Sequence, residues 1–195
     1  MIIGITGSMG SGKSTAAGFC EELGYRRLDS DALIREILHE PDVVAAVVAQ
    51  FGSNVRDQNG SLDRRAIAQI VFNDDVAREW LENLLHPRLF ARWREAFAAD
   101  DATSWVVEVP LLFEKQLENW FDFIICVASS SDLQLARLEK RGISHALAEQ
   151  RISKQLPLAT KLERADFVLW NDGSRDFLRE QLVVLQPQLT PTSRC

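Results

Sequence analysis

Short apolar runs alternate with longer stretches of helical pattern along the chain of 195 residues. The apolar runs are rich in β-branched residues and end at turn-forming residues, which is typical of buried strands. Strands separated by helices predict an α/β fold, in which helices flank a parallel sheet and ligands bind at the carboxyl ends of its strands. The expected strands are residues 2–6, 25–28, 104–109, 123–128 and 167–170.

The helical stretch between the second and third strands is longer than a crossover connection needs. It predicts a helical lobe over about residues 35–100 beside a core of about 1–34 and 101–185, within one domain of residues 1–195. His86-Pro87 is expected to interrupt the longest stretch, because proline lacks an N–H and clashes with the preceding turn. The expected helices are residues 14–23, 31–39, 42–51, 62–97, 132–156 and 174–185, followed by a frayed tail at 186–195.

Composition narrows the possible partners. Hydrophobic residues make up 46% of the chain and the net charge is -6, which argues against non-specific binding to nucleic acid. Cys20, Cys126 and Cys195 form no disulfide framework, and the first residues form neither a signal peptide nor a membrane span. The expectation is therefore a cytoplasmic protein that binds neither nucleic acid nor a membrane. A monomer is expected, but the sequence itself does not give the oligomeric state.

The most specific motif is GSMGSGKS at residues 7–14, which matches G-x-x-x-x-G-K-[ST] at every fixed position. An expected strand precedes the motif and an expected helix follows it. The motif therefore predicts a P-loop NTPase-type sheet with a loop that binds a nucleoside triphosphate. Lys13 would reach the β- and γ-phosphates, Ser14 would bind Mg²⁺, and backbone N–H groups would cradle the phosphates. The residues expected to bind ATP here are Gly10, Ser11, Gly12, Lys13, Ser14 and Thr15.

Other parts of the chain favour a small-molecule kinase among the classes that use this loop. The chain has no [NT]-K-x-D motif for reading guanine, and it is short for an ATPase motor. Asp29 and Asp31 follow the second expected strand, where carboxylates can serve a metal ion and an acceptor hydroxyl. The alternative is that one of them caps the next helix. A non-catalytic nucleotide-binding protein is a further alternative.

A basic segment follows the fourth expected strand. Arg137 and Arg141 stand one helical turn apart, so both can face one ligand, and residues 137–164 are expected to form a lid over ATP. The alternative is that these charges lie on solvated helix faces.

Several segments in order resemble the dephospho-coenzyme A kinase family, up to about Gly173. They are ITGSMGSGKST at 5–15, LDSDALIRE at 28–36, GSLDRRAIAQIVF at 60–72, LLHP at 84–87, VPLLFE at 109–114, QLARLEKRG at 134–142 and ADFVLWNDG at 165–173. The resemblance implies transfer of the ATP γ-phosphate to the ribose 3′-hydroxyl of dephospho-CoA. A nucleoside or nucleotide monophosphate kinase of similar topology is the alternative.

The resemblance also implies roles for single residues. Asp31 would be the catalytic base, Asp29 would belong to the same motif, and Arg137 or Arg141 would be the lid arginine on the phosphates. Asn171 would lie near the adenine. The acceptor site would include Arg64, His86, Pro87 and Glu114.

Some of these segments also allow simpler interpretations. His86-Pro87 would only break a helix, and Leu111, Leu112 and Phe113 would only pack in the core. Glu108 would be either an acid near the metal, as in a Walker B motif, or an edge charge.

Overall fold

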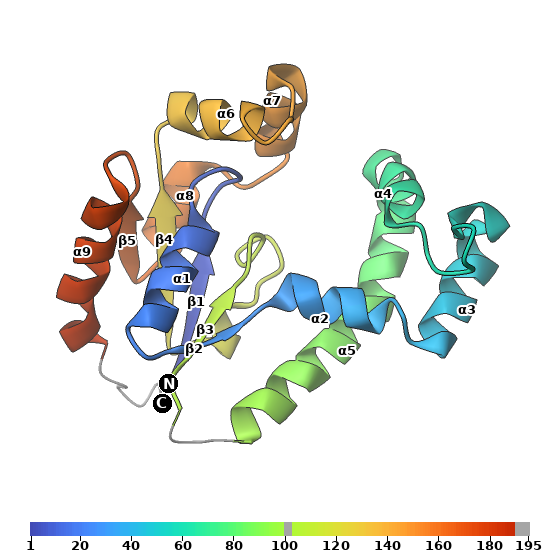
Figure 1. The fold of residues 1–195 in the computed structure, drawn as a ribbon, viewed down its shortest axis with the longest axis horizontal. Helices are drawn as coiled ribbons and strands as arrows, with labels where there is room; N and C mark the ends of the chain where they lie inside the picture. The colour runs from blue at the N-terminus through green and yellow to red at the C-terminus, as the bar shows by residue number, and fades with distance from the viewer. Residues whose placement is uncertain (100–102, 190–195) are drawn as a thin grey trace. The chain divides into compact units, whose positions relative to one another are not determined.

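The computed structural model describes residues 1–99 and 103–189, and the chain divides into two compact units. The first unit comprises the described residues of Met1–Leu28 and Asp100–Cys195, and the second comprises Asp29–Ala99. Figure 1 shows a sheet in the first unit and helices in the second.

The sheet of the first unit is parallel throughout and has the strand order β2-β3-β1-β4-β5. The strands are β1 Ile2–Thr6, β2 Arg26–Leu28, β3 Trp105–Glu108, β4 Phe123–Ala128 and β5 Phe167–Trp170. All five lie where the apolar runs predict them, and the predicted α/β fold class is confirmed. Because β1 lies at the centre of the sheet, the loop that follows it starts from a strand that is paired on both sides.

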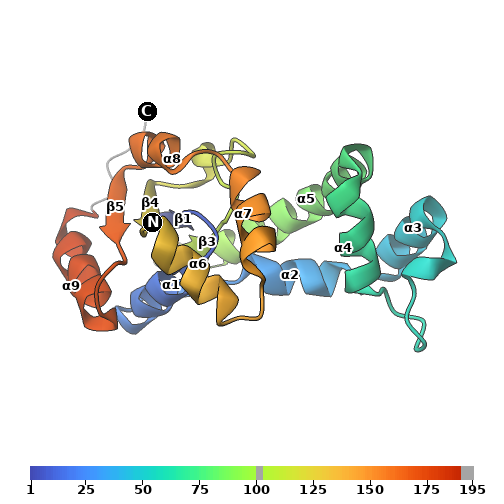
Figure 2. The ribbon, with the colours of Figure 1, turned by 90° about the horizontal axis from the view of Figure 1, so that it is seen from above.

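Helices cover both faces of this sheet (Figure 2). Helices α1 (Lys13–Glu22) and α9 (Arg175–Leu185) pack on one face and contact each other. Helix α8 (Leu158–Arg164) packs against β4 on the other face. Between the sheet and the first two helices lies a core that includes Ile3, Ile125 and Leu182.

Two details of the first unit differ from the sequence-based expectation. The helical run expected over residues 132–156 is two helices, α6 (Ser131–Glu139) and α7 (His145–Ser153). Between them Gly142 has a φ of 79°, a left-handed conformation that ends a helix and that glycine adopts readily. Helix α8 was not expected at all.

The tail also differs, as far as it is described. Gln186–Gln188 form a short 3₁₀ helix, and Leu189 is buried in the core. The expectation of fraying is therefore wrong for these residues, while residues 190–195, including Cys195, lie outside the described residues. In the part of the chain that the structure describes, no helix has the length and apolar character to span a membrane.

The second unit is helical. It contains α2 (Ser30–Ile37), α3 (Pro41–Phe51), a 3₁₀ turn η1 (Ser53–Val55), α4 (Arg64–Asn73) and α5 (Asp75–Ala98). Helix α5 packs against α2 and α4. The unit spans Asp29–Ala99, and the assignment of residues 35–100 as a separate lobe stays a prediction.

The prediction that His86-Pro87 interrupts the helix is wrong, because α5 continues through Pro87. The break lies at Asp74, whose carboxylate caps α5 by accepting hydrogen bonds from the N–H groups of Val76 and Ala77 at 2.9 and 3.0 Å. Next to Pro87, the Arg88 guanidinium donates to the carbonyl of Leu84 at 3.1 Å. This contact lies in the same turn as the backbone hydrogen bond that proline removes.

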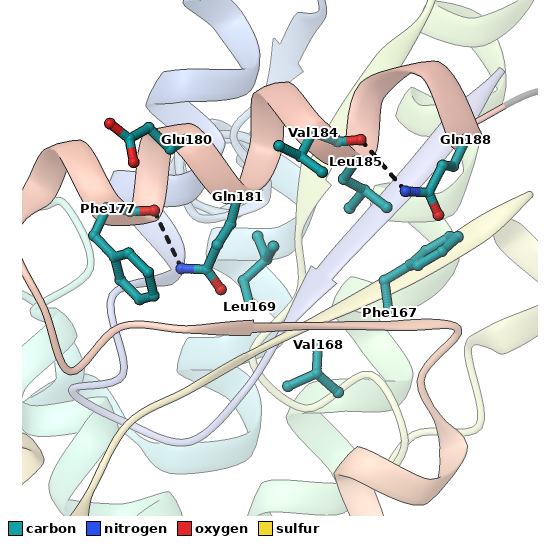
Figure 3. Close-up of a pocket in the computed structure, with 9 residues that line it drawn as sticks. All are labelled: Phe167, Val168, Leu169, Phe177, Glu180, Gln181, Val184, Leu185 and Gln188. Carbon is teal, nitrogen blue, oxygen red and sulfur yellow. Dashed lines mark hydrogen bonds between the residues drawn. The ribbon is translucent and has the colours of Figure 1, made fainter.

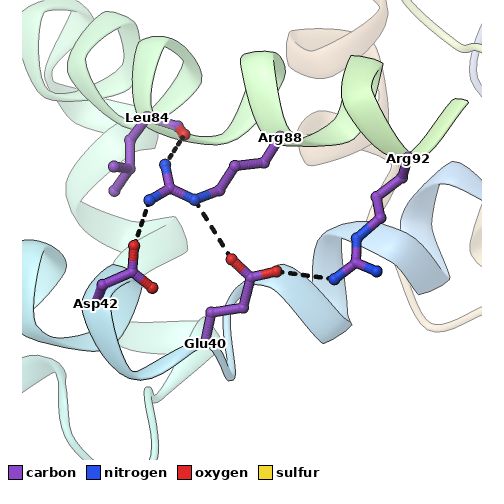
Figure 4. A network of polar contacts seen from close by, with 5 residues as sticks. All are labelled: Glu40, Asp42, Leu84, Arg88 and Arg92. Carbon is purple, nitrogen blue, oxygen red and sulfur yellow. Dashed lines mark hydrogen bonds and ion pairs between the residues drawn. The ribbon is translucent and has the colours of Figure 1, made fainter. Parts of the chain in front are cut away.

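Arg88 also joins two helices of the second unit (Figure 4). Its guanidinium lies 2.5 Å from Asp42 and 3.4 Å from Glu40, which in turn lies 3.2 Å from Arg92. The network holds the start of α3 against α5. Arg88 lowers the pKa of the Asp42 carboxyl through their hydrogen bond.

Candidate active site

The phosphate loop, residues 7–14, joins β1 to α1 and has the conformation its glycines allow. Gly7, Gly10 and Gly12 all have positive φ, and a Cβ at Gly12 would lie only 2.0 Å from Nδ2 of Asn171. The backbone N–H groups of Gly10, Gly12, Lys13 and Ser14 have no acceptor among the described residues. Unpaired donors at the start of a helix form an anion-binding site.

Lys13 lies under this loop. Its Nζ donates to the carbonyls of Gly7 and Ser8, both at 3.0 Å, and the residue is 8% exposed. Burial lowers the pKa of Lys13 to about 8, against the opposing effect of the Glu108 carboxylate. The ammonium is thus fixed in place by the loop that it serves.

Ser14 lies next to Glu108, an acidic residue for which the sequence allowed two roles. Its hydroxyl donates to Glu108 Oε1 at 2.9 Å, and Arg27 lies 3.4 Å from the other carboxylate oxygen. Glu108 ends β3, directly beside Ile5 of β1, so the parallel sheet brings it to the phosphate loop. This position favours an acid near the metal over an edge charge.

Hydroxyl and carboxylate oxygens are the ligands that Mg²⁺ prefers in proteins. Among the described residues, no group of three or more acidic, histidine or cysteine side chains is placed to hold a metal ion. Mg²⁺ usually binds through one or two protein oxygens together with substrate phosphates, and the pair Ser14–Glu108 fits that arrangement.

Arg137 and Asn171 contact the backbone of the loop. The Arg137 guanidinium donates to the carbonyls of Gly10, Ser11 and Asn171 at 3.4, 3.3 and 2.6 Å. Asn171 Nδ2 donates to the carbonyl of Ser11 at 2.7 Å. Both side chains therefore hold loop carbonyls, a role that the sequence analysis did not assign to them.

Arg141 is placed differently from Arg137. Helix α6 ends at Glu139, so the expected helical spacing of the two arginines does not hold. Arg141 is exposed, and its charge lowers the pKa of Lys13. The lid over residues 137–164 stays a prediction, although its last part, α8, packs against the sheet.

Glu114 belongs to a buried network that sequence reasoning missed. Its Oε1 lies 2.8 Å from Nζ of Lys161 and accepts the N–H of Leu156 at 3.0 Å. Lys161 is fully buried, which is rare for a lysine. The spacing of charges in the sequence did not indicate this burial. Core packing is confirmed for Leu112 and Phe113, but Leu111 is 36% exposed.

Asp29 and Asp31 lie in the second unit, at the start of α2. Asp29 caps this helix by accepting the N–H of Ala32 at 2.9 Å, so the capping alternative is confirmed for it. Asp31 is exposed in the first turn.

The expected acceptor-site residues of the second unit lie on two other helices. Arg64 begins α4 and is exposed, whereas His86 and Pro87 lie within α5. The His86 ring stacks in a tilted arrangement on Phe90, with 5.6 Å between centroids.

An open groove on the first unit runs along the edge strand β5 and helix α9 (Figure 3). Its lining is largely apolar, and Gln181 in it binds the backbone N–H and carbonyl of Trp170 at 2.9 and 2.8 Å. No phosphate-loop residue lines this groove. The lining residues are Phe167, Val168, Leu169, Phe177, Glu180, Gln181, Val184, Leu185 and Gln188.

A parallel sheet whose central strand leads into a phosphate loop defines the P-loop class of nucleotide-binding proteins. The fold is shared with the shikimate kinase from Bacteroides thetaiotaomicron, at a TM-score of 0.53 and 20% identity over 97% of this chain and 98% of that one.

More similar proteins define the family. The family model of dephospho-CoA kinase matches residues 1–176. The dephospho-CoA kinase of Geobacillus kaustophilus is 36% identical over 193 residues, with 96% of each chain covered, and that of a Synechococcus species is 41% identical over 187 residues, with 94% covered. A solved dephospho-CoA kinase from Campylobacter jejuni has a TM-score of 0.70 at 29% identity, with 96% of each chain covered. This chain belongs to the dephospho-CoA kinase family.

Proposed function

We propose that this chain transfers the γ-phosphate of ATP to the ribose 3′-hydroxyl of dephospho-CoA, giving coenzyme A and ADP. The observation that carries the proposal is the phosphate loop, with Lys13 and the Ser14–Glu108 pair, in a chain that matches the family over residues 1–176. Family membership favours this acceptor over the nucleoside or nucleotide monophosphate of the alternative hypothesis.

On the donor side, the free N–H groups of Gly10, Gly12, Lys13 and Ser14 would bind the phosphates. The Lys13 ammonium would neutralise charge on the β- and γ-phosphates. Ser11 and Thr15 complete the expected ATP-binding stretch. Donors fixed in this way would stabilise the developing charge without reorganising, which is how electrostatic preorganisation lowers a barrier.

Mg²⁺ would be held by the Ser14 hydroxyl with the help of Glu108, and it would offset negative charge on the phosphates. Asp29 is a weaker candidate ligand, because its carboxylate already caps α2. Arg141, exposed past the end of α6, is the better placed of the two arginines to reach a phosphoryl group, because Arg137 is committed to loop carbonyls. Asn171 would act on ATP through the loop that it holds, in addition to the adenine contact the family implies.

On the acceptor side, Asp31 would accept the proton of the ribose 3′-hydroxyl as its oxygen bonds to the γ-phosphorus. The bond from the γ-phosphorus to the bridging oxygen breaks, and its electron pair leaves with ADP. Arg64, His86 and Pro87 would line the acceptor site. For Glu114 the acceptor role rests on the family resemblance alone, because its contacts are to Lys161 and the N–H of Leu156.

The direct test incubates the purified chain with ATP, Mg²⁺ and dephospho-CoA and measures CoA and ADP. We expect the two products in equal amounts and turnover that requires Mg²⁺. Parallel reactions with AMP, CMP and a nucleoside test the alternative acceptors. Absence of CoA at high enzyme concentration, or preferred turnover of a monophosphate, would overturn the proposal.

We also propose that the protein works as a monomer in the cytoplasm. The two cysteines of the described residues are free and buried, which fits a reducing compartment. Light scattering after size exclusion, at catalytic concentration, tests the oligomeric state, and a dimer mass would contradict it.

A further inference from the structure

One hydrogen bond joins two segments that are far apart in the sequence: the phosphate loop, and the connector between α7 and α8, residues 154–157. The backbone N–H of Met9 donates to Oε1 of Gln155 at 3.1 Å, across 146 positions of sequence. Gln155 follows the last turn of α7, and its own N–H donates to the carbonyl of Ile152 at 3.0 Å. The side chain therefore reaches the loop from a backbone that is itself held.

The next residue of the connector is fixed from the opposite side. The N–H of Leu156 donates to Glu114 Oε1, and the same oxygen lies 2.8 Å from Nζ of Lys161. Lys161 is 0% exposed and belongs to α8, which packs on β4. A buried ion pair gives little net stability, because desolvation of both charges offsets their attraction. Its consequence here is geometric, since it ties the connector to the sheet.

Met9 differs from the loop residues that follow it. The N–H groups of Gly10, Gly12, Lys13 and Ser14 have no acceptor among the described residues, whereas that of Met9 is held by a side chain. Gln155 thus restrains the loop at the residue just before the anion-binding donors begin. The N–H donors that follow bind an anion only where the loop presents them together, so a restraint at this point matters for the affinity for ATP.

We propose that Gln155 is a positioning residue for the phosphate loop, and that the buried Glu114–Lys161 pair holds it in place through the connector. The inference rests on the proposed kinase activity, and it adds a path from α8 to the ATP site. Gln155 acts through Met9 and touches neither the acceptor nor the reacting atoms in this path. A looser loop binds ATP more weakly in the ground state and in the transition state alike, which raises the KM for ATP and leaves kcat unchanged.

The test is the substitution Gln155→Met, which keeps the length of the side chain and removes its acceptor oxygen. Binding of a non-hydrolysable ATP analogue with Mg²⁺, measured by calorimetry, should weaken about tenfold, the upper range for one neutral hydrogen bond. The KM for ATP should rise in parallel, with kcat and the KM of the acceptor unchanged. Gln50→Met is the matched control, because Gln50 is exposed on α3, outside the predicted lid, and it should bind the analogue like the unchanged protein.

Lys161→Met tests the second half of the path. It should also weaken analogue binding, and the double variant with Gln155→Met should bind no more weakly than the weaker single variant, because both changes release the same contact. Arg164→Met is its control, since Arg164 lies on the same helix and pairs with Glu118 at the surface. If Lys161→Met does not fold, Gln155→Met and its control decide the proposal.

Unchanged analogue affinity in folded Gln155→Met would overturn the inference, even if the melting temperature fell. Multiplied effects in the double variant would overturn the role of Lys161. Analogue binding requires no acceptor, so these outcomes are independent of whether dephospho-CoA is the substrate.

Discussion

The two units of the protein use charged side chains in different ways. Around the phosphate loop the polar groups are largely buried, and Lys13, Arg137 and Asn171 each hold a carbonyl of the loop. In the second unit Arg88 and Arg92 pair with Glu40 and Asp42 at the surface, where Asp42 is 66% exposed. Exposed pairs contribute little to stability, whereas buried groups fix geometry. The side chains that position groups for catalysis are therefore concentrated in the buried network around the phosphate loop. Substitutions in the two units should differ accordingly in their effects.

The largest effect is expected from Lys13→Ala, which removes the buried cation of the loop. The kcat/KM for ATP should fall about 10³-fold, the range for losing a preorganised donor to transition-state charge. Steady-state kinetics and analogue binding measure the loss in rate and in affinity. An unaffected rate, in a variant that folds normally by circular dichroism, would mean that the loop has been misinterpreted.

Asp31→Asn tests an exception to this difference between the units. Asp31 is an exposed residue of the second unit, yet its loss is expected to lower the rate strongly. Loss of the base should lower kcat by at least about 10²-fold, with ATP binding largely kept. Asp29→Asn is the matched control, since asparagine caps a helix as well as aspartate does, and it should change kcat little. Normal turnover by Asp31→Asn would refute the assignment of the base.

Glu108→Gln tests the role of the half-buried acid beside Ser14. The substitution keeps an acceptor for the Ser14 hydroxyl but removes the charge, so the Mg²⁺ concentration for half-maximal rate should rise about tenfold. Glu118→Gln, which changes the exposed partner of Arg164, provides the comparison and should leave the Mg²⁺ requirement as it is. Equal Mg²⁺ curves for both variants would exclude Glu108 from the metal site.

Arg88→Ala should have a smaller effect, confined to stability. It removes the surface pairs with Glu40 and Asp42 and the contact with the Leu84 carbonyl, and the free energy of unfolding should fall by about 1 kcal/mol. Urea denaturation measures the change, and hydrogen exchange should locate it in α3 and α5. A loss of several kcal/mol would show that this network is more than a surface feature.

The smallest effect is a pH dependence of the same network. Arg88 lowers the pKa of Asp42 in the folded state, so the pair stabilises the protein above the ordinary pKa of an aspartate. This contribution is lost as the pH falls through the lowered pKa, because the carboxyl then becomes neutral. The difference in stability between the unchanged protein and Asp42→Asn should therefore be constant near neutral pH and shrink in strong acid. A difference that grows with falling pH would contradict the assigned sign.

The sequence predicts the sheet well, because buried parallel strands are short continuous apolar runs such as residues 123–128. It fails at Pro87, where side chains of neighbouring turns and helices stabilise a helix that proline alone would interrupt. It also misses α8, a helix of seven residues whose burial depends on β4. Local patterns do not report such tertiary contacts.

In the candidate site too, residues of a local motif could be predicted from the sequence, and residues linked by long-range contacts could not. The phosphate loop is local and its motif is visible within eight residues, so Lys13 and Ser14 could be assigned directly. Gln155 and Lys161 act through residues 146 and 47 positions away, and nothing in their immediate neighbours marks them. Arg137 is a basic residue of the expected lid in the sequence, but only the structure shows that it binds loop carbonyls.

The central place of β1 has a consequence for the order in which the protein matures on the ribosome. Its two neighbours, β3 and β4, are made only after residue 104, and Asn171 contacts Ser11 across 160 positions. β1 is therefore not fully enclosed until these later segments have been synthesised. A nascent chain that stops before Asn171 contains the whole glycine-rich motif but lacks a side chain that holds the loop. Nucleotide added to stalled chains of increasing length should thus protect β1 and the phosphate loop from protease only once the chain extends past Asn171.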